Sequence, residues 1–438
     1  MADAARVRDL WPLALMRARA GEPPPEVEVA RPASHEEVAA LLRSGRRVVP
    51  MGGASGVCGA LAPEAGDLVL DLGGLDRVEI DGANLLVRAG AGVNGLDLER
   101  RLHERGLTLG HFPSSLPDAT VGGLVSTRST GQESTRHGGV EDLLVGLTVA
   151  LEDGTIAEAR PHPRTAAGPP LHLLFAGAEG TLGVVLEAVL RVRRRPEAVI
   201  GGGWRLARLE AGLAVVREVM QRDLRPLVLR LYDPADSAFQ GLDAGCLLVA
   251  AAAGPRAVAE AEAGAVSEVA AGAGAEPLGE APWEHWLAHR FDLSADRLRR
   301  YLAPPGAFLD TIELATVWTG LPALYEDVRA HLAAAAGIVL CHFSHPSAQG
   351  CCAYFTFAGS APDEAAAEVS YLSAWRGAME IALRHGATIS HHHGVGQVRA
   401  PWIRAELGGW WHVWSRVRRA LDPHTTLNAA GMGGERQS

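Results

Sequence analysis

Histidines and one tyrosine are the residues of this chain best suited to chemistry, and they lie in its last quarter. Three consecutive histidines, His391–His393, can transfer protons because the pKa of an imidazole lies near neutrality. The ordinary pKa of a tyrosine is about 10, so Tyr354 takes part in proton transfer only where nearby cations lower that value. The histidines and two arginines, Arg230 and Arg290, can supply such cations, and arginine also binds a phosphate bidentately.

The same residues permit a second interpretation, a metal site. In an extended segment His391 and His393 share one face, while His392 points to the other. Zinc needs three or four ligands. The remaining candidate ligands are His342, His345, Cys341, Cys351 and Cys352. A metal hydrolase is therefore a third functional hypothesis, although we predict no resident metal. If these residues have no functional role, Tyr354 is a core tyrosine and the two arginines form surface ion pairs.

Three glycine-rich turns beside expected strands form a second group of candidate residues. The first, Pro50–Gly56, can turn several backbone N–H groups toward one anion such as a diphosphate. It matches neither the GxGxxG dinucleotide pattern nor a P-loop. The second, Gly110–Val145, is expected to be too glycine-rich for a packed helix, and the third, Glu179–Gly183, precedes a strand. Together the turns predict an extended ligand lying across one domain.

Two α+β domains are expected to position these groups. Ser34 and Glu37 have capping-box spacing ahead of a helix, and Asp81-Gly82 is a hairpin signal between two strands. The segment Arg193–Pro196 is the expected domain edge. Beyond that edge, strands and helices alternate in a way that predicts an antiparallel sheet covered by helices on one side.

The predicted boundaries are residues 1–195 for the first domain and 196–400 for the second. Residues 401–438 are expected to form a helical segment that packs back on the first domain. In that segment Trp410, Trp414, Val417 and Leu421 recur at helical spacing, and we interpret this stripe as core packing.

Composition indicates a cytoplasmic protein acting on a small molecule. The chain has 438 residues, which is longer than a single hydrophobic core usually supports. Its net charge of −10 argues against nucleic-acid binding, and its five cysteines form no CxxC pair. No apolar run reaches membrane-spanning length, and the N-terminus lacks the apolar core of a signal peptide. A lipid-like substrate, peripheral membrane contact and a homodimer are left open.

The three turns resemble those of a known flavoprotein superfamily. The order strand–PxGGxS, SxxxxTVGG and EGTLGV is similar to that of the vanillyl-alcohol oxidase and p-cresol methylhydroxylase superfamily. The resemblance implies an α+β, two-domain FAD-binding fold of the p-cresol methylhydroxylase type, with an antiparallel-sheet cap domain for substrate and with non-covalent FAD. The implied cofactor-binding residues are Pro50, Met51, Gly52, Gly53, Ala54, Ser55, Gly56, Ser114, Ser115, Leu116, Pro117, Asp118, Ala119, Thr120, Gly122, Gly123, Thr127, Arg128, Ser129, Thr130, Glu179, Gly180, Thr181, Leu182, Gly183, Val184 and Val185.

Within that superfamily the chain is most similar to the alkylglycerone-phosphate synthase branch. VGGLVSTRSTGQESTRHGGVEDLLVG, ISHHHGVG and CAYFTF carry this resemblance. It implies the exchange of an acyl for an alkyl group on a keto-phosphate, through an adduct at flavin N5. Tyr354, His391, His392 and His393 are then catalytic, and Arg230, Arg290 and His342 bind substrate.

Three positions differ from the synthase pattern. His342 stands where an arginine is expected in animal synthases, Gln397 where a lysine is expected, and His137 where a tyrosine is usual. Fewer cations could weaken phosphate binding. The alternative is therefore an FAD-dependent oxidoreductase that acts on a 2-hydroxy acid or a related alcohol.

Overall fold

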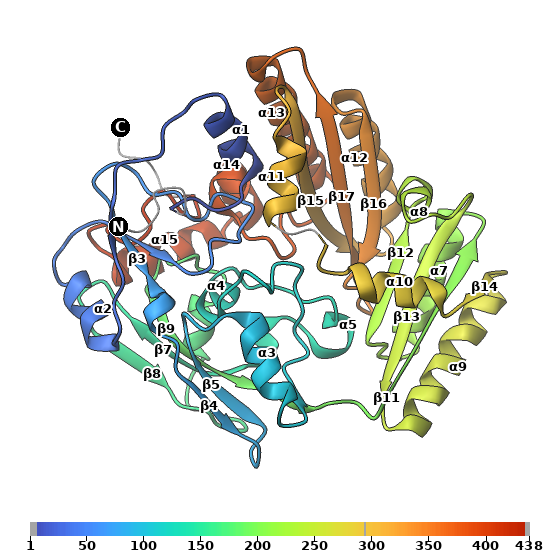
Figure 1. Ribbon diagram of the computed structural model, residues 1–438, viewed down its shortest axis with the longest axis horizontal. Helices are drawn as coiled ribbons and strands as arrows, with labels where there is room; N and C mark the ends of the chain where they lie inside the picture. Colours follow the sequence, from blue (N-terminus) through green and yellow to red (C-terminus); the bar gives the residue numbers. More distant parts are fainter. Residues whose placement is uncertain (1–6, 293–294, 434–438) are drawn as a thin grey trace. The chain divides into compact units, whose positions relative to one another are not determined.

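The computed structural model describes residues 7–292 and 295–433, which fall into two compact units (Figure 1). The first unit comprises residues 1–131, 139–194 and 392–438. The second comprises residues 132–138 and 195–391. Both units contain helices and sheets, so the chain is an α+β protein, as predicted.

The first unit is built on two main sheets. A parallel sheet has the order β1-β3-β2, and the C-terminal segment joins it where Leu427 bridges Val48. An antiparallel sheet has the order β4-β5-β9-β7-β8, and β6 pairs with β10 in a small ribbon. The strands are β1 (Glu28–Ala30), β2 (Val48–Met51), β3 (Leu68–Asp71), β4 (Val78–Asp81), β5 (Leu86–Gly90), β6 (Leu107–Thr108), β7 (Leu144–Ala150), β8 (Ile156–Ala159), β9 (Val184–Arg191) and β10 (Arg193–Arg194). The hairpin predicted at Asp81-Gly82 is β4–β5, and β7–β8 forms a second antiparallel hairpin.

Short helices connect these strands. The predicted capping residue is confirmed, because Ser34 Oγ accepts a hydrogen bond from the backbone N–H of Glu37 at 3.2 Å and begins α2. The helices and 3-10 turns of the unit are α1 (Pro12–Arg19), α2 (His35–Leu42), η2 (Leu72–Gly74), α3 (Gly95–His103), α4 (Val121–Ser126), α6 (Val140–Leu143), η3 (Leu171–Phe175), α14 (Gly396–Leu407) and α15 (Trp410–Leu421).

The expectation that Gly110–Val145 is too glycine-rich for packed helices is wrong. The stretch contains α4 and α6 in the first unit and α5 (Ser134–His137) in the second. In α4 the apolar residues Val121, Leu124 and Val125 stand at helical spacing, and all three are buried. Their burial against the sheet, where α4 contacts β9, outweighs the low helix propensity of the intervening glycines.

The aromatic stripe near the C-terminus is also not the core packing that we expected. Gly408 interrupts the helical pattern between α14 and α15. Trp410 is 72% exposed, and α15 contains no fully buried residue. Trp414, Val417 and Leu421 are only half-buried. Helical spacing finds residues on one face of a helix, but it does not show that another element covers that face.

The second unit is one seven-stranded antiparallel sheet with the order β14-β11-β13-β12-β16-β17-β15 (Figure 1). Its strands are β11 (Ala198–Leu206), β12 (Val228–Tyr232), β13 (Cys246–Gly254), β14 (Glu276–Gly279), β15 (Ala307–Val317), β16 (Ile338–Ser344) and β17 (Gly350–Ser360). Its other helices are α7 (Leu209–Gln221), α8 (Pro234–Phe239), α9 (Arg256–Gly272), α10 (Ala281–His289), α11 (Ala295–Leu302), α12 (Leu321–Ala335) and α13 (Glu364–Arg384). Across the described residues, no helix combines the length and apolar character needed to cross a membrane.

Helices cover both faces of this sheet, which corrects the prediction of a single covered face. Gly212 of α7 lies against Leu231 of β12, whereas Trp283 and Trp286 of α10 pack in one cluster with Tyr232. Successive residues of a strand point to opposite faces, so Leu231 and Tyr232 mark the two sides of the sheet. Propensity and periodicity identify such helices but do not assign each one to a face.

Candidate active site

A row of polar side chains crosses one face of the sheet in the second unit. Tyr232 of β12 pairs with His342 of β16, His342 pairs with Tyr354 of β17, and Tyr354 pairs with Glu313 of β15. Directly paired residues of an antiparallel sheet point to the same face. Four residues from separate parts of the sequence therefore lie side by side, and two of them, His342 and Tyr354, were predicted site residues.

Arg230 and His342 form a fixed hydrogen-bonded pair beside this row. Arg230 Nη2 lies 3.0 Å from His342 Nε2, and His342 Nδ1 lies 3.4 Å from Asp236 Oδ2. A guanidinium can only donate, so Nε2 must be the acceptor and the ring proton sits on Nδ1, facing Asp236. Burial, aided by Arg230, lowers the pKa of His342 to about 4, although Asp236 opposes the shift. His342 is therefore neutral near pH 7 and serves to orient Arg230.

Tyr354 is stacked on His342, with ring centroids 4.6 Å apart. Burial raises the pKa of Tyr354 well above its usual value; Glu313 and Asp310 add to the rise, while Thr311 and Arg230 oppose it. The expectation that cations lower this pKa is therefore wrong in this structure, because loss of solvent outweighs the charge of Arg230. Tyr354 is a neutral phenol that can donate a hydrogen bond, and its proton is transferred only where a bound ligand lowers the pKa.

Arg290 follows α10 and is paired with an acid that sequence reasoning missed. Its Nη1 lies 3.2 Å from Glu133 Oε1, and its carbonyl accepts a hydrogen bond from Gln132 Nε2 at 2.9 Å. The guanidinium carbons of Arg290 and Arg230 each lie 6.0 Å from the Trp286 ring. Trp286 precedes Arg290 by one helical turn, and that spacing is the sequence signal that could have placed Trp286 beside this arginine.

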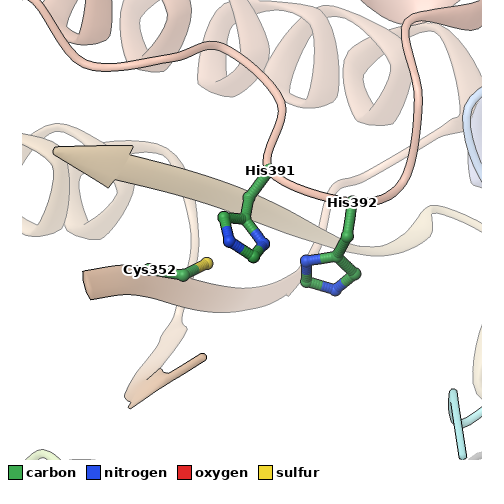
Figure 2. Close-up of side chains that lie close together, drawn as sticks. All are labelled: Cys352, His391 and His392. Atoms are coloured by element: carbon green, nitrogen blue, oxygen red, sulfur yellow. The ribbon is translucent and has the colours of Figure 1, made fainter. Parts of the chain in front are cut away.

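The first of the three consecutive histidines, His391, lies beside Cys352 of the sheet. Ligand atoms of Cys352 and His391 lie within 4.8 Å of each other (Figure 2). Figure 2 also shows His392, the next residue along the chain, which opens the last segment of the first unit. Cys352 shares the face of His342 and Tyr354, whereas Cys341 and Cys351 point to the other face. Two of the three cysteines considered as metal ligands therefore cannot join His391.

His392 and His393 belong to the first unit, where their rings meet edge to face at a centroid distance of 4.6 Å. The thiol of Cys58 donates to the His393 carbonyl, with Sγ and O 3.2 Å apart. His345, in the second unit, stacks on His391 at 5.2 Å and contacts Ser134 Oγ at 2.6 Å.

The three glycine-rich turns lie close together in the first unit. A Cβ added to Gly52 would lie 2.3 Å from Thr120 Oγ1, which joins the first turn to the second. A Cβ added to Gly180 would lie 3.0 Å from Pro50 Cγ, which joins the third turn to the first. The backbone N–H of Glu179 also donates to Ser126 O at 2.9 Å. We call this convergence of turns the cradle.

Two known protein families match the chain. The family described as "FAD linked oxidases, C-terminal domain" matches residues 195–431, and the family described as "FAD binding domain" matches residues 28–160. The second match covers the first turn of the cradle and Ser114–Thr120. The first match covers Arg230, His342, Tyr354 and His391–His393.

Curated relatives include synthases and oxidoreductases. The alkyldihydroxyacetonephosphate synthase of Dictyostelium discoideum is 28% identical over 91% of this chain and 72% of its own length. The uncharacterized FAD-linked oxidoreductase YgcU of Escherichia coli K12 is 30% identical over 87% of this chain and 82% of its own length.

Solved structures show the same fold. An alkyldihydroxyacetonephosphate synthase superposes with a TM-score of 0.77 at 25% identity, over 91% of this chain and 76% of that chain. A substrate-bound p-cresol methylhydroxylase superposes with a TM-score of 0.75 at 13% identity, over 92% of this chain and 88% of that chain. The p-cresol methylhydroxylase-type fold is therefore confirmed, and FAD is the cofactor of the matched families.

The cradle fits such a cofactor. Thr120 Oγ1 is buried and has no hydrogen-bond partner among the described residues, which is costly unless a ligand supplies one. A Cβ at Gly53 would lie 1.8 Å from the Asp118 carbonyl oxygen, so only glycine allows these two backbones to approach so closely. A turn with successive glycines beside a polar hydroxyl suits a diphosphate.

Proposed function

Because this chain belongs to the FAD-linked oxidase family and is an FAD-dependent enzyme, we propose that it exchanges an acyl for an alkyl group on a keto-phosphate. The supporting observation is the Arg230–His342–Tyr354 arrangement, which sets an anion-binding guanidinium beside a neutral proton donor. The synthase relatives, which align over nine-tenths of the chain, favour the same reaction. The exchange releases the acyl group as a carboxylate and incorporates an alcohol, with no net oxidation.

Each residue of the arrangement has a separate task in this proposal. Arg230 binds the anionic group of the substrate, and Asp236 with His342 keeps its guanidinium in one orientation. Tyr354 holds its proton because it is buried, and it donates that proton to a substrate oxygen. His391, His392 and His393 supply further proton-transfer groups. Arg290 contributes a second cation for the substrate.

FAD would be held by the cradle, through the residues of Pro50–Gly56, Ser114–Thr120, Thr127–Thr130 and Glu179–Val185. Backbone N–H groups of the first turn would face the diphosphate, and Thr120 Oγ1 would gain its missing hydrogen bond. When bound, the flavin supplies the electrophilic ring on which the exchange depends.

A second candidate is the oxidation of a 2-hydroxy acid or a related alcohol. The observation in its favour is that His342 is neutral and adds no positive charge beside Arg230. A single carboxylate then fits this site as well as a phosphate does. The Escherichia coli relative is also named as an oxidoreductase.

The two candidates are separated by mixing the FAD-loaded enzyme with substrates under anaerobic conditions. With acyl-dihydroxyacetone phosphate and labelled hexadecanol, we expect labelled ether product and free fatty acid in equal amounts without an electron acceptor. Bleaching of the flavin absorbance by glycolate or D-lactate, with recovery after an acceptor is added, would instead establish oxidation. Failure to form the labelled ether would overturn the proposed exchange.

A further inference from the structure

A buried carboxylate in the first unit holds the backbone that follows the three histidines. Glu179 is 5% exposed. Its Oε1 accepts hydrogen bonds from the backbone N–H of Val395 at 2.5 Å and of Gly396 at 3.1 Å. Its Oε2 accepts from Gly396 N–H at 3.0 Å. Both oxygens of one side chain are thus committed to two consecutive peptide groups, two and three residues after His393.

This carboxylate sits at the N-terminus of α14, a helix of 12 residues that begins at Gly396. The first N–H groups of a helix lack partners within the helix, and a negative charge there is favourable. Burial raises the pKa of Glu179, while the hydrogen bonds from Gly396 and Val395 and the charge of Arg399 oppose the rise. Arg399 Nη1 also donates to Gly394 O at 3.0 Å, so a side chain of α14 holds the segment that precedes the helix.

The fit around this carboxylate leaves no space for a larger residue in the turn. Gly394 has a φ of +92°, and a Cβ there would lie 2.5 Å from Glu179 Oε1. On the other side, the Cys58 thiol donates to His393 O at 3.2 Å, and the backbone carbonyl oxygen of Cys58 accepts from Val398 N–H at 3.1 Å. The backbone of residues 393–398 is therefore fixed from both ends of the turn.

Glu179 itself adopts a backbone conformation that is unusual for a residue with a side chain. Its φ is +50°. The conformation is held by Glu179 N–H donating to Ser126 O at 2.9 Å and by Asn428 Nδ2 donating to Glu179 O at 2.7 Å. Such strain persists only where surrounding contacts enforce it, and it is concentrated at functional sites. Here it directs the side chain of a cradle residue toward the histidine turn.

We propose that Glu179 is a positioning residue, which acts on the reaction by fixing His392 and His393 through the backbone that follows them. The inference rests on the proposed function, in which these histidines transfer protons. The third cradle turn then has two separate roles. The backbone of this turn lines the cradle, whereas the Glu179 carboxylate orders the histidine segment.

The test compares Glu179→Gln with Glu99→Gln in the FAD-loaded enzyme. The glutamine at 179 keeps the length of the side chain but replaces one acceptor oxygen with an N–H₂ group that faces backbone donors. Glu99 is a matched control, because it is buried in the same unit and its carboxylate accepts from the backbone N–H of Leu109 at 2.9 Å.

Two measurements do not depend on the substrate. Hydrogen exchange of the peptide spanning residues 392–398 should be at least about 10-fold faster in Glu179→Gln and unchanged in Glu99→Gln. The Hε1 chemical shifts of His392 and His393, assigned from single His→Gln variants, should change in Glu179→Gln and stay at their wild-type values in Glu99→Gln. Wild-type exchange in Glu179→Gln, or unchanged Hε1 chemical shifts, would overturn the proposal.

The third measurement is turnover. In Glu179→Gln, kcat should fall about 10-fold to 100-fold with KM little changed and FAD content retained. Faster exchange together with wild-type kcat and a wild-type pH profile would refute the positioning role. If the wild-type enzyme itself forms no ether product, the proposed acyl-for-alkyl reaction fails, while hydrogen exchange and the Hε1 chemical shifts still decide whether Glu179 fixes the histidines.

Discussion

At the scale of single residues, burial determines which protonation states the site can use. Loss of solvent lowers the pKa of His342 to about 4 and raises the pKa of Tyr354, so both side chains are neutral near pH 7. The positive charge next to them resides on Arg230, whose guanidinium cannot lose its proton. In the proposed reaction, the neutral His342 between Arg230 and Asp236 therefore orients the guanidinium, and Tyr354 is the proposed proton donor.

We therefore predict that Tyr354→Phe abolishes turnover, with kcat reduced about 100-fold to 10,000-fold because a general acid is lost. Flavin absorbance after gel filtration should equal that of the wild type, because the predicted FAD contacts lie in other segments. The matched control is Tyr371→Phe, which removes a buried hydroxyl that donates to Asp310 Oδ2 at 2.5 Å. That variant should lose stability but keep kcat. Retained activity in Tyr354→Phe would remove Tyr354 from the catalytic role.

At the scale of elements, the sequence predicted the strands and turns well and their lateral arrangement poorly. Turn residues such as Asp81-Gly82 and the Ser34 cap are local signals, and the structure confirms both. The row from Tyr232 to Glu313 depends on the register between four strands, which no local pattern encodes. For the same reason the sequence could not show that Cys341, on another strand, points to the face opposite Tyr354.

The cradle gives a prediction at this scale. Gly53→Ala should weaken FAD binding at least about 10-fold, because the new Cβ would lie 1.8 Å from Asp118 O and push two of the turns apart. Gly82→Ala is the matched control, since a Cβ at this hairpin glycine has no neighbour within 4 Å. Affinity is measured by recovery of flavin absorbance when the apoprotein is titrated with FAD. Equal affinity in the two variants would contradict this assignment of the cradle.

At the scale of the whole molecule, chain order is a poor guide to which residues group together. Residues 132–138 belong to the second unit although their neighbours on both sides belong to the first. Because residues 132–138 pack in the second unit, Glu133 pairs with Arg290, which is 157 residues away in the sequence. The three histidines are likewise divided, with His391 in one unit and His392 and His393 in the other. Long-range grouping of this kind follows from tertiary packing, which local periodicity does not report.

In the first unit, hydrogen bonds also link segments that are far apart in the sequence, and Asp9 makes one of these links. Its carboxylate accepts from the backbone N–H of Trp11 at 3.3 Å and of Ala60 at 3.0 Å. Burial raises the pKa of Asp9 from 3.8 to about 7, even though backbone hydrogen bonds oppose the rise. Between these two pH values the folded protein binds more protons at Asp9 than the unfolded chain does.

The unfolding free energy contributed by Asp9 must therefore fall as the pH rises from about 4 to about 7. Relative to Asp9→Asn, which does not titrate, the wild type should lose on the order of 4 kcal/mol over this range. His111 and His342, whose pKa values burial lowers to about 4, act with the opposite sign, but they are present in both proteins and cancel in the difference.

Urea unfolding curves at several pH values measure this difference between the wild type and Asp9→Asn. The control is Asp81→Asn, at an exposed hairpin where hydrogen bonds from Asn84 lower the carboxyl pKa below 3.8, so its difference from the wild type should stay constant from pH 4 to pH 7 and fall only at lower pH. If the wild-type and Asp9→Asn curves stay parallel from pH 4 to pH 7, Asp9 is ionised throughout. Closure of the N-terminal segment onto the loop at Ala60 would then be independent of pH.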